Sequence, residues 1–249
     1  MQDNCQKRRQ RRYSNLFATI KKMKKEQFGV EQYNKRYASS KEHDPKNAVT
    51  SFVDKYLKKG QHCLDLGSGG GRHSEYIARK DIKVTAVDIS PVGIEKTKEM
   101  LSNFSDSNIA VVANMQQLPF KDQSFDSLIA NRVLDHNNNK GIEKTFSEIE
   151  RVLKNNSMVF IAVASISQSL KENRTIIEKN KTGGITFVSQ NDSMQNEIVH
   201  HHFSEQEIIK LARQYHFAIL EIKESMKTDK KGEQKFEWQI IMKKVIKKK

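Results

Sequence analysis

The sequence predicts an α/β fold with a doubly wound, mostly parallel, seven-stranded Rossmann-like sheet and a C-terminal antiparallel hairpin. Short apolar runs alternate with helix-like segments between residues 60 and 165, which is the pattern of βαβ units and a parallel sheet. A glycine-rich turn follows the first of these runs, as in folds that bind nucleotide-like ligands. Apolar residues alternate over 218–222 and again over 236–242, and a charged loop joins the two segments, which indicates the hairpin.

A chain of 249 residues has room for one large α/β domain. We expect a basic N-terminal extension or cap over 1–45 and a single domain over 46–249. Within that domain, 166–200 reads as an insertion over the sheet edge because the alternation of strands and helices breaks there. No apolar run approaches the roughly 18 residues of a membrane span. We therefore expect no transmembrane segment.

Two cysteines, one near the N-terminus and one in a predicted strand, favour neither a disulfide framework nor a thiolate metal site. This usage is typical of a reducing compartment, so we expect a cytoplasmic protein. The first 25 residues are rich in arginine and lysine and contain only one acid, Asp3. A mitochondrial presequence is therefore the less favoured alternative.

The net charge of +14 is concentrated at the two ends of the chain. Residues 1–25 contain nine basic residues and one acid, and residues 226–249 contain nine basic residues and three acids. The body between them is close to neutral. Such ends could bind the phosphates of RNA, or they could be solvated tails.

The N-terminal region predicts helices before the first strand. Residues 13–28 have apolar residues at helical spacing with lysines between them, which is typical of a basic amphipathic helix. Tyr33 and Tyr37 then share one helix face, and they could cover a cofactor or substrate pocket. Asp44-Pro45 reads as an N-cap followed by a first-turn proline, and it should open a helix that ends near Leu57.

The strands of the parallel sheet are expected at 62–66, 82–88, 109–112, 125–130 and 158–165. Ser90-Pro91 should begin the helix that follows the second strand. An apolar stripe from Ile142 to Leu153 predicts the helix before the fifth strand, with a turn at 154–156 where asparagine can adopt the left-handed conformation. Ser204 and Glu207 form a capping box at the start of a later helix.

The glycine turn excludes some ligands. The dinucleotide pattern that starts at Gly67 needs a glycine where Arg72 stands, and no Gly-Lys-Ser/Thr follows as in a phosphate-binding P-loop. The residues instead fit Asp-x-Gly-x-Gly-x-Gly, which begins at Asp65. A carboxylate beside the turn suits a cationic ligand. Asp88, at the end of the second strand, is placed to accept hydrogen bonds from ribose hydroxyls.

Four motifs together resemble the class I S-adenosylmethionine-dependent methyltransferases. They are CLDLGSGGGRH, VTAVDIS, ANMQQLPFKDQSFDSLIANRVLDH and EIERVLK, and they cover about 60–165. Beyond residue 165, the run from Gly183 through the three histidines to Trp238 is similar to small-molecule methyltransferases of the tellurite-resistance-like kind.

The resemblance implies S-adenosylmethionine as cofactor and assigns roles to single positions. The methionine part would lie on the glycine loop, with the far end closed by the segment after the fourth strand. The ribose and the adenine would lie beyond the second and third strands. The implied residues are Asp65, Gly67, Ser68, Gly69 and Gly71 for the methionine part, Asp88 for the ribose, Ile89 for one adenine face, Asn114 and Met115 for the adenine edge, and Asn131 and Arg132 at the methionine end.

Two positions depart from the family pattern. The family usually has aspartate where Asn114 stands. Residues 131–134 are not the Asn-Pro-Pro-aromatic element of enzymes that methylate amino groups of nucleic acids. The second departure lowers the expectation of base N-methylation.

We expect direct in-line methyl transfer to a small-molecule acceptor. If the acceptor must lose a proton, His136 or His201 is the expected base, because imidazole titrates near neutrality. No metal site is expected, because neighbouring histidines on an extended chain point to opposite faces. An RNA-directed methyltransferase and a non-catalytic cofactor-binding module remain alternatives. Acceptor pockets in this fold vary, so the sequence predicts neither the acceptor nor the oligomeric state.

Overall fold

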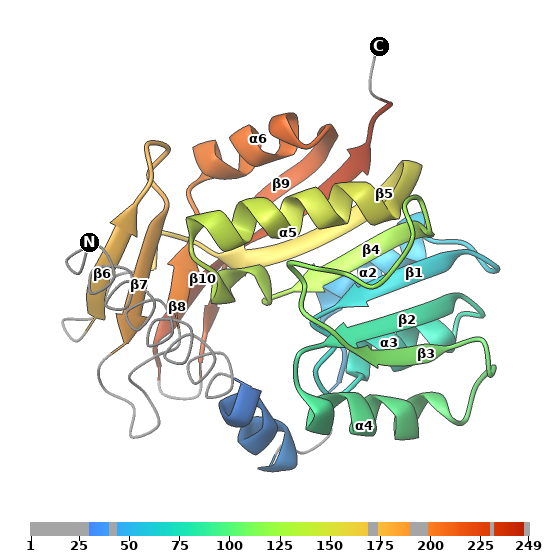
Figure 1. Ribbon diagram of the computed structural model, residues 1–249. Coiled ribbons are helices and arrows are strands. Elements are labelled where there is room, and N and C mark those ends of the chain that lie inside the picture. Colours follow the sequence, from blue (N-terminus) through green and yellow to red (C-terminus); the bar gives the residue numbers. More distant parts are fainter. Residues whose placement is uncertain (1–29, 40–43, 169–173, 190–198, 230–231, 247–249) are drawn as a thin grey trace, which may run out of the picture.

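The computed structural model describes residues 30–39, 44–168, 174–189, 199–229 and 232–246. Seven strands form one sheet in the order β3-β2-β1-β4-β5-β10-β9. The first five are parallel, and β10 runs antiparallel to both β5 and β9. The predicted Rossmann-like sheet with a terminal hairpin is therefore confirmed (Figure 1). Its strands are β1 (His62–Leu66), β2 (Lys83–Asp88), β3 (Ile109–Val112), β4 (Phe125–Asn131), β5 (Leu153–Ala164), β9 (Phe217–Thr228) and β10 (Gln234–Lys244).

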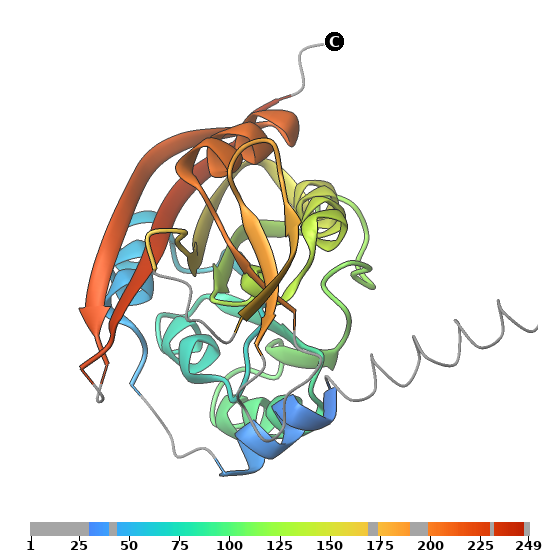
Figure 2. The same ribbon diagram turned by 90° about the vertical axis from the view of Figure 1, so that its left-hand side faces the viewer.

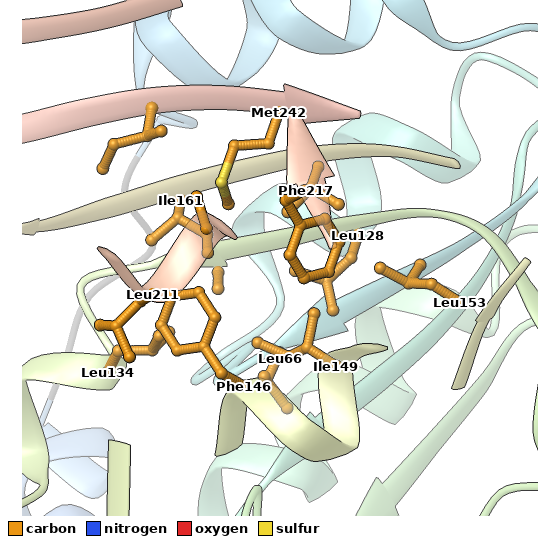
Figure 3. Close-up of a cluster of buried hydrophobic side chains, with 14 of the residues drawn as sticks. Leu66, Leu128, Leu134, Phe146, Ile149, Leu153, Ile161, Leu211, Phe217 and Met242 are labelled. Atoms are coloured by element: carbon orange, nitrogen blue, oxygen red, sulfur yellow. The ribbon is translucent and has the colours of Figure 1, made fainter. Parts of the chain in front are cut away.

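Helices cover both faces of this sheet. The described helices are a helix over 30–39, α2 (Asn47–Tyr56), α3 (Arg72–Ala78), α4 (Pro91–Leu101), the short 3-10 helix η1 (Leu134–His136), α5 (Asn139–Val152) and α6 (Glu205–Gln214). Because side chains of a strand alternate between faces, Leu64 joins the core under α5 and α6, whereas Cys63 joins the core under α2 and α3. Figure 3 shows the first core, where Phe146 and Ile149 of α5 lie near Leu66.

The helix before β1 begins later than predicted. Lys46, and not Asp44, is the N-cap residue of α2, and its side chain makes no capping hydrogen bond. The Lys46 carbonyl accepts from the backbone N–H groups of Val49 and Thr50. The Lys46 N–H donates to His73 Nε2 at 3.4 Å, so the start of this helix contacts α3.

The turn predicted at 154–156 lies inside a strand. β5 begins at Leu153, which pairs with Phe125, and the register shifts before Met158 pairs with Ser127. The intervening residues are therefore an irregularity within the strand. Asn156 has φ 65°, which is the left-handed conformation expected of an asparagine here.

The helix starts predicted at Ser90 and Ser204 are confirmed, because each hydroxyl accepts from a backbone N–H of the first turn. The capping box is only half formed. The Ser204 hydroxyl accepts from the Glu207 N–H at 3.1 Å, but the Glu207 carboxylate binds Asn180 and His201 instead of returning to Ser204.

The segment after β5 contains three strands that the sequence did not predict. β6 (Arg174–Lys179), β7 (Ile185–Ser189) and β8 (Val199–His202) form a separate antiparallel sheet. The edges of the large sheet are β3 and β9, so this small sheet does not cover a sheet edge as predicted. It lies at the carboxyl ends of the parallel strands, where the Phe203 N–H donates to the Ala164 carbonyl. In Figure 2 it stands in front, above the helix over 30–39.

Some predictions fall on residues outside this description. The basic helix over 13–28 and the N-terminal charges lie outside the described residues. In the described part of the chain, no helix is both long and apolar enough to span a membrane. The division into 1–45, 46–249 and the insertion 166–200 stays our proposal, and the compartment stays a prediction.

Candidate active site

The glycine turn between β1 and α3 is tied to the end of β2. The N–H groups of Gly67 and Ser68 both donate to the Val87 carbonyl, at 2.7 and 3.0 Å. Gly67 has φ 74° and Gly69 has φ 59°, in the region that residues with a β-carbon avoid. A β-carbon at Gly67 would lie 2.4 Å from Val133 Cγ2. The turn therefore needs glycine for both its backbone conformation and its close packing.

Asp88 closes the other side of this turn. Its Oδ2 accepts from the Gly69 N–H and its Oδ1 from the Ser90 N–H, both at 2.9 Å. The residue is 7% exposed, and burial raises the pKa of its carboxyl, although the backbone donors act in the opposite direction. Each carboxylate oxygen keeps acceptor capacity for a ligand.

The helix over 30–39 lies across the turn. Asn34 Oδ1 accepts from the Ser90 hydroxyl at 2.6 Å, which joins this helix to the first turn of α4. A β-carbon at Gly69 would lie 2.9 Å from Tyr37 Cε1, so the tyrosine ring rests directly on the glycine turn. Tyr33, one turn earlier, packs its ring edge-on against His136 with 5.5 Å between centroids. Burial raises the pKa of Tyr37 to about 12.

These elements enclose a cavity of about 1130 Å³ at the carboxyl ends of the parallel strands. The structure brings most of the predicted residues to it. The predicted residues that line it are Tyr33, Tyr37, Gly67, Ser68, Gly69, Asp88, Ile89, Asn114, Met115, Asn131, Arg132 and His136. Asp65, Gly71 and His201 are not among the lining residues.

Asp65 lies beneath the turn. It is buried, and its Oδ2 accepts from the Ser74 hydroxyl at 2.6 Å, which ties β1 to α3. Burial raises its pKa to about 7, although Ser74 and Arg72 act in the opposite direction. Gly71 does not line the cavity either; it packs against α4, where a β-carbon would lie 3.0 Å from Thr97 Cα. Both residues support the loop and do not line the cavity.

The segments after β3 and β4 form further walls. Asn114 Oδ1 accepts from the Gln116 N–H at 2.9 Å, which leaves its amide nitrogen for other partners. Arg132 has φ 59°, and its Nε lies 2.7 Å from Asp135 Oδ2. The buried Asp135 also accepts from the Ala164 N–H at 3.3 Å. Arg132 is therefore held by an acid of its own segment.

His136 lies between two other rings. Tyr33 packs on one side, and the His200 ring lies 5.3 Å away, also edge-on. Burial lowers the pKa of His136 to about 4, and the nearby charges of Arg36 and Arg132 add to this effect. The imidazole is therefore neutral at physiological pH, where it can accept a hydrogen bond or a proton.

The placement of His201 corrects the prediction. Its side chain is 0% exposed and lies away from the cavity. Its Nδ1 is hydrogen-bonded to Thr186 Oγ1 at 2.8 Å and its Nε2 to Glu207 Oε2 at 2.9 Å. Because neighbouring strand residues face opposite sides, His200 lines the cavity instead.

We therefore expect His201→Leu to destabilise the protein without changing its affinity for S-adenosylhomocysteine. The substitution leaves Thr186 and Glu207 buried without this partner, at a cost of about 1–3 kcal/mol per group. Denaturant unfolding and calorimetric titration of the same samples would measure both effects. His200→Leu is the matched variant from the cavity side. Lost methyl transfer with unchanged stability in His201→Leu would contradict this placement.

Three buried polar atoms at the cavity bear on whether the lining residues fit a polar ligand. Tyr33 Oη, Ser68 Oγ and His136 Nδ1 have no hydrogen-bond partner within the described part of the chain. Each such atom costs about 1–3 kcal/mol if it stays unpaired. All three belong to lining residues. A polar ligand in this cavity would satisfy them, so the residues fit a polar cofactor and acceptor.

Sequence reasoning missed several lining residues. Arg36, Lys46, Arg72 and His200 all line the cavity. Arg36 could have been found, because it lies one helical turn from Tyr33, which was singled out. No motif or spacing near Lys46 in the sequence marks it as a lining residue.

A seven-stranded sheet of this order, with a glycine turn and an acidic strand end around one cavity, is the architecture of the class I S-adenosylmethionine-dependent methyltransferases. The comparisons with known proteins point to the same class. Residues 64–161 match the methyltransferase domain family, which supports S-adenosylmethionine as the cofactor.

Relatives and solved structures support the same class. An uncharacterized methyltransferase of Bacillus subtilis is 30% identical over 110 residues, which cover 44% of this chain and 46% of that protein. A demethylmenaquinone methyltransferase of Tropheryma whipplei is 30% identical over 123 residues, which cover 45% of this chain and 50% of that protein. The chain thus spans about half the length of these curated relatives.

The fold is shared with solved methyltransferase structures. A Methanosarcina mazei protein described as an S-adenosylmethionine-dependent methyltransferase superposes with a TM-score of 0.63 at 22% identity, over 82% of this chain and 100% of that one. The 1,6-didemethyltoxoflavin-N1-methyltransferase of Burkholderia thailandensis, solved with 1,6-didemethyltoxoflavin and S-adenosylhomocysteine, gives 0.62 at 17% identity, over 80% and 78%. The narrower resemblance to tellurite-resistance-like enzymes stays a prediction.

Proposed function

We propose that this chain transfers a methyl group from S-adenosylmethionine directly, in line, to a small-molecule acceptor. The observation that carries the proposal is a single cavity shared by two sets of residues. One wall holds the glycine turn and Asp88, and the other holds Tyr33, His136 and His200. Its volume of about 1130 Å³ is slightly above the roughly 300–1,000 Å³ of sites for one small molecule, and the helix over 30–39 covers it.

In this proposal, different residues of the cavity wall bind different parts of the cofactor. The backbone of the glycine turn and Asn131 bind the methionine part, and Asp88 accepts from the ribose hydroxyls. Ile89 covers one adenine face, and Asn114 and Met115 meet its edge. Asp65 supports the glycine turn from beneath, through its hydrogen bond with Ser74.

The cofactor, when bound, supplies an activated methyl group, so the chain has to orient the acceptor and exclude water. Tyr37 rests on the glycine turn and excludes water from it. Neutral His136, with its unpartnered Nδ1, accepts the proton of an acceptor that must lose one. The relative from Burkholderia thailandensis, whose acceptor is a small molecule, supports the same assignment.

The experiment offers S-adenosylmethionine with a labelled methyl group to three fractions of a native cell extract. These are a small-molecule filtrate, the RNA and the protein. We expect label in the filtrate. Label only in RNA would favour the RNA-directed alternative, which rests on the basic ends. No label in any fraction, with intact binding of S-adenosylhomocysteine, would favour the non-catalytic module.

His136 should make the stability of the protein depend on pH. Its folded pKa of about 4 lies below the usual value near 6.5. Between these values the unfolded chain binds more protons, so stability falls as the pH drops from 6.5 towards 4. His136→Asn should reduce this slope by up to about 1.4 kcal/mol per pH unit. Urea unfolding at pH 7 and pH 5 would measure it, and equal slopes in both proteins would contradict a buried neutral His136.

A further inference from the structure

Three aromatic side chains from separate parts of the chain form one wall of the cavity, called the ring wall below. They are Tyr33 of the helix over 30–39, His136 of η1 and His200 of β8. The ring centroids of Tyr33 and His136 lie 5.5 Å apart, and those of His136 and His200 lie 5.3 Å apart, both pairs edge-on. Phe187 of β7 does not line the cavity, but it stacks on His200 at 5.6 Å with 23° between the planes. The lining rings and the ring beneath them therefore form one continuous array.

The ring wall borders the glycine turn through two elements. Tyr37 rests on Gly69, and it lies one helical turn, about 6 Å along the helix axis, from the tyrosine of the ring wall. In the segment after β4, Val133 packs directly on Gly67, and its carbonyl accepts from the His136 N–H at 3.2 Å. A molecule on the ring wall is therefore next to a cofactor held by the glycine turn.

The charges around the cavity do not favour one kind of acceptor. Five basic side chains line it, and so do four acidic ones, Glu75, Asp88, Glu99 and Asp135. Because the two signs are nearly balanced, the ring wall distinguishes acceptors better than the charge of the cavity does.

An array of this kind favours a flat, aromatic molecule. Aromatic rings attract one another edge-on or offset-stacked at centroid distances of about 4.5–7 Å, beyond the effect of buried area. The contacts within the array already lie in this range. An aromatic ring of the acceptor extends the array, whereas a saturated chain gains only the burial of its surface.

His136 is a base without a carboxylate partner. Within the described part of the chain its side chain forms no hydrogen bond, and its Nδ1 is buried. The neighbouring Asp135 is engaged elsewhere, with Arg132 Nε at 2.7 Å and the Ala164 N–H at 3.3 Å. A carboxylate that accepts from one imidazole nitrogen makes the other a stronger base, and His136 lacks this support. Burial lowers its pKa to about 4. It therefore suits an acceptor whose own proton is acidic.

A group conjugated to an aromatic ring meets both conditions. Its hydroxyl or N–H proton is more acidic than that of a saturated alcohol or amine, because the ring delocalises the electron pair that is left behind. The same ring supplies the flat surface that the ring wall favours.

We propose that the acceptor is a planar aromatic molecule with a hydroxyl or N–H group conjugated to its ring, which packs on the ring wall and gives its proton to His136. This inference rests on the proposed function and names the substrate class of the same site. The oxygen or nitrogen of the acceptor forms a bond to the methyl carbon, whose bond to sulfur breaks with both electrons left on sulfur. The proton passes to the imidazole of His136 and from there to water. The products are the methylated ring compound and S-adenosylhomocysteine.

The first test identifies the product. A small-molecule filtrate of native cell extract is incubated with the chain and with S-adenosylmethionine whose methyl group is labelled for NMR. We expect a labelled product with the near-ultraviolet absorption band of an aromatic ring, and with the new methyl group on an oxygen or nitrogen bonded to that ring. A labelled product without such a band, or with the methyl group on carbon, on sulfur or on a saturated chain, would overturn the proposal.

The second test uses His200→Leu, which removes a ring of the wall, and His200→Phe, which keeps one. With the acceptor identified in the first test, His200→Leu should raise the half-saturating concentration about twofold to tenfold, as expected for a lost aromatic pair. His200→Phe should raise it less. Equal half-saturation in His200→Leu and the unsubstituted chain, or in the two variants, would overturn the proposal.

Tyr56→Leu is the control for the loss of a ring. Tyr56 lies on α2, its hydroxyl donates to Glu221 at 2.6 Å, and it does not line the cavity. This variant should leave the half-saturating concentration unchanged. A rise as large as that in His200→Leu would show that the ring wall has no special role and would overturn the proposal.

Titration with S-adenosylhomocysteine separates this inference from the proposed function. We expect His200→Leu to bind this compound as the unsubstituted chain does, because the ring wall is assigned to the acceptor. A loss of that affinity would place the ring wall at the cofactor and overturn the proposal. If the filtrate gains no label from the unsubstituted chain, the proposed function itself fails.

Discussion

Gly67→Ala should abolish measurable binding of S-adenosylhomocysteine. The new β-carbon would lie 2.4 Å from Val133 Cγ2 and 2.5 Å from Val133 Cβ, so either the turn or the segment after β4 must move. Both carry cavity-lining residues. Misplacement by about 1 Å can slow a reaction about 100-fold, and we expect a loss of affinity at least as large in a calorimetric titration.

Gly60→Ala is the matched control for this substitution. Gly60 also has a positive φ, 82°, but nothing lies within 4 Å of a β-carbon built there. It should cost about 1–2 kcal/mol of stability from the backbone conformation alone and leave the affinity for S-adenosylhomocysteine unchanged. The pair separates backbone strain from the steric clash. Gly67→Ala binding like the unsubstituted chain would contradict the described packing of the turn.

Asp88→Ala should give the second largest loss of affinity for S-adenosylhomocysteine. It removes the acceptor of the Gly69 and Ser90 N–H groups and, in the proposed assignment, the partner of the ribose. Hydrogen bonds to a charged group are worth about 1.5–3 kcal/mol each, or about tenfold to 100-fold in affinity. Both S-adenosylhomocysteine and 5′-methylthioadenosine should be affected alike in a titration, since both contain the ribose.

Asp54→Ala is the control for the loss of a carboxylate. Asp54 is exposed on α2, where it binds Lys80 and Tyr76, and it does not line the cavity. It should leave both affinities unchanged. Unaltered affinity in Asp88→Ala would remove the ribose assignment.

The cofactor wall could be predicted because its signals are local. The glycine turn and Asp88 each lie where a strand passes into a helix, and the residues that mark them are adjacent in the sequence. The same locality explains why the helix start at Ser90 was predicted correctly. However, a pattern of neighbouring residues does not show which side chains reach the ligand and which are buried beneath the turn. Asp65 is therefore assigned to the ligand from the sequence, although it lies beneath the turn.

The acceptor wall could not be predicted because it is assembled from distant segments. Which of His200 and His201 faces the cavity depends on the register of β8 with β7, where His200 pairs with Phe187 and His201 with Thr186. That register is a tertiary property of a sheet whose strands were not predicted. Similarly, Glu237 of β10 lies beside Lys46 and Arg132, and no sequence spacing links these three residues.

The central claim is that this cavity binds S-adenosylmethionine on the glycine turn. Calorimetric titration of the full chain with S-adenosylhomocysteine, alongside Gly67→Ala and Gly60→Ala, tests it most directly. We predict one micromolar site that is retained in Gly60→Ala and lost in Gly67→Ala. Absence of binding to the full chain, or equal binding to all three proteins, would contradict the claim.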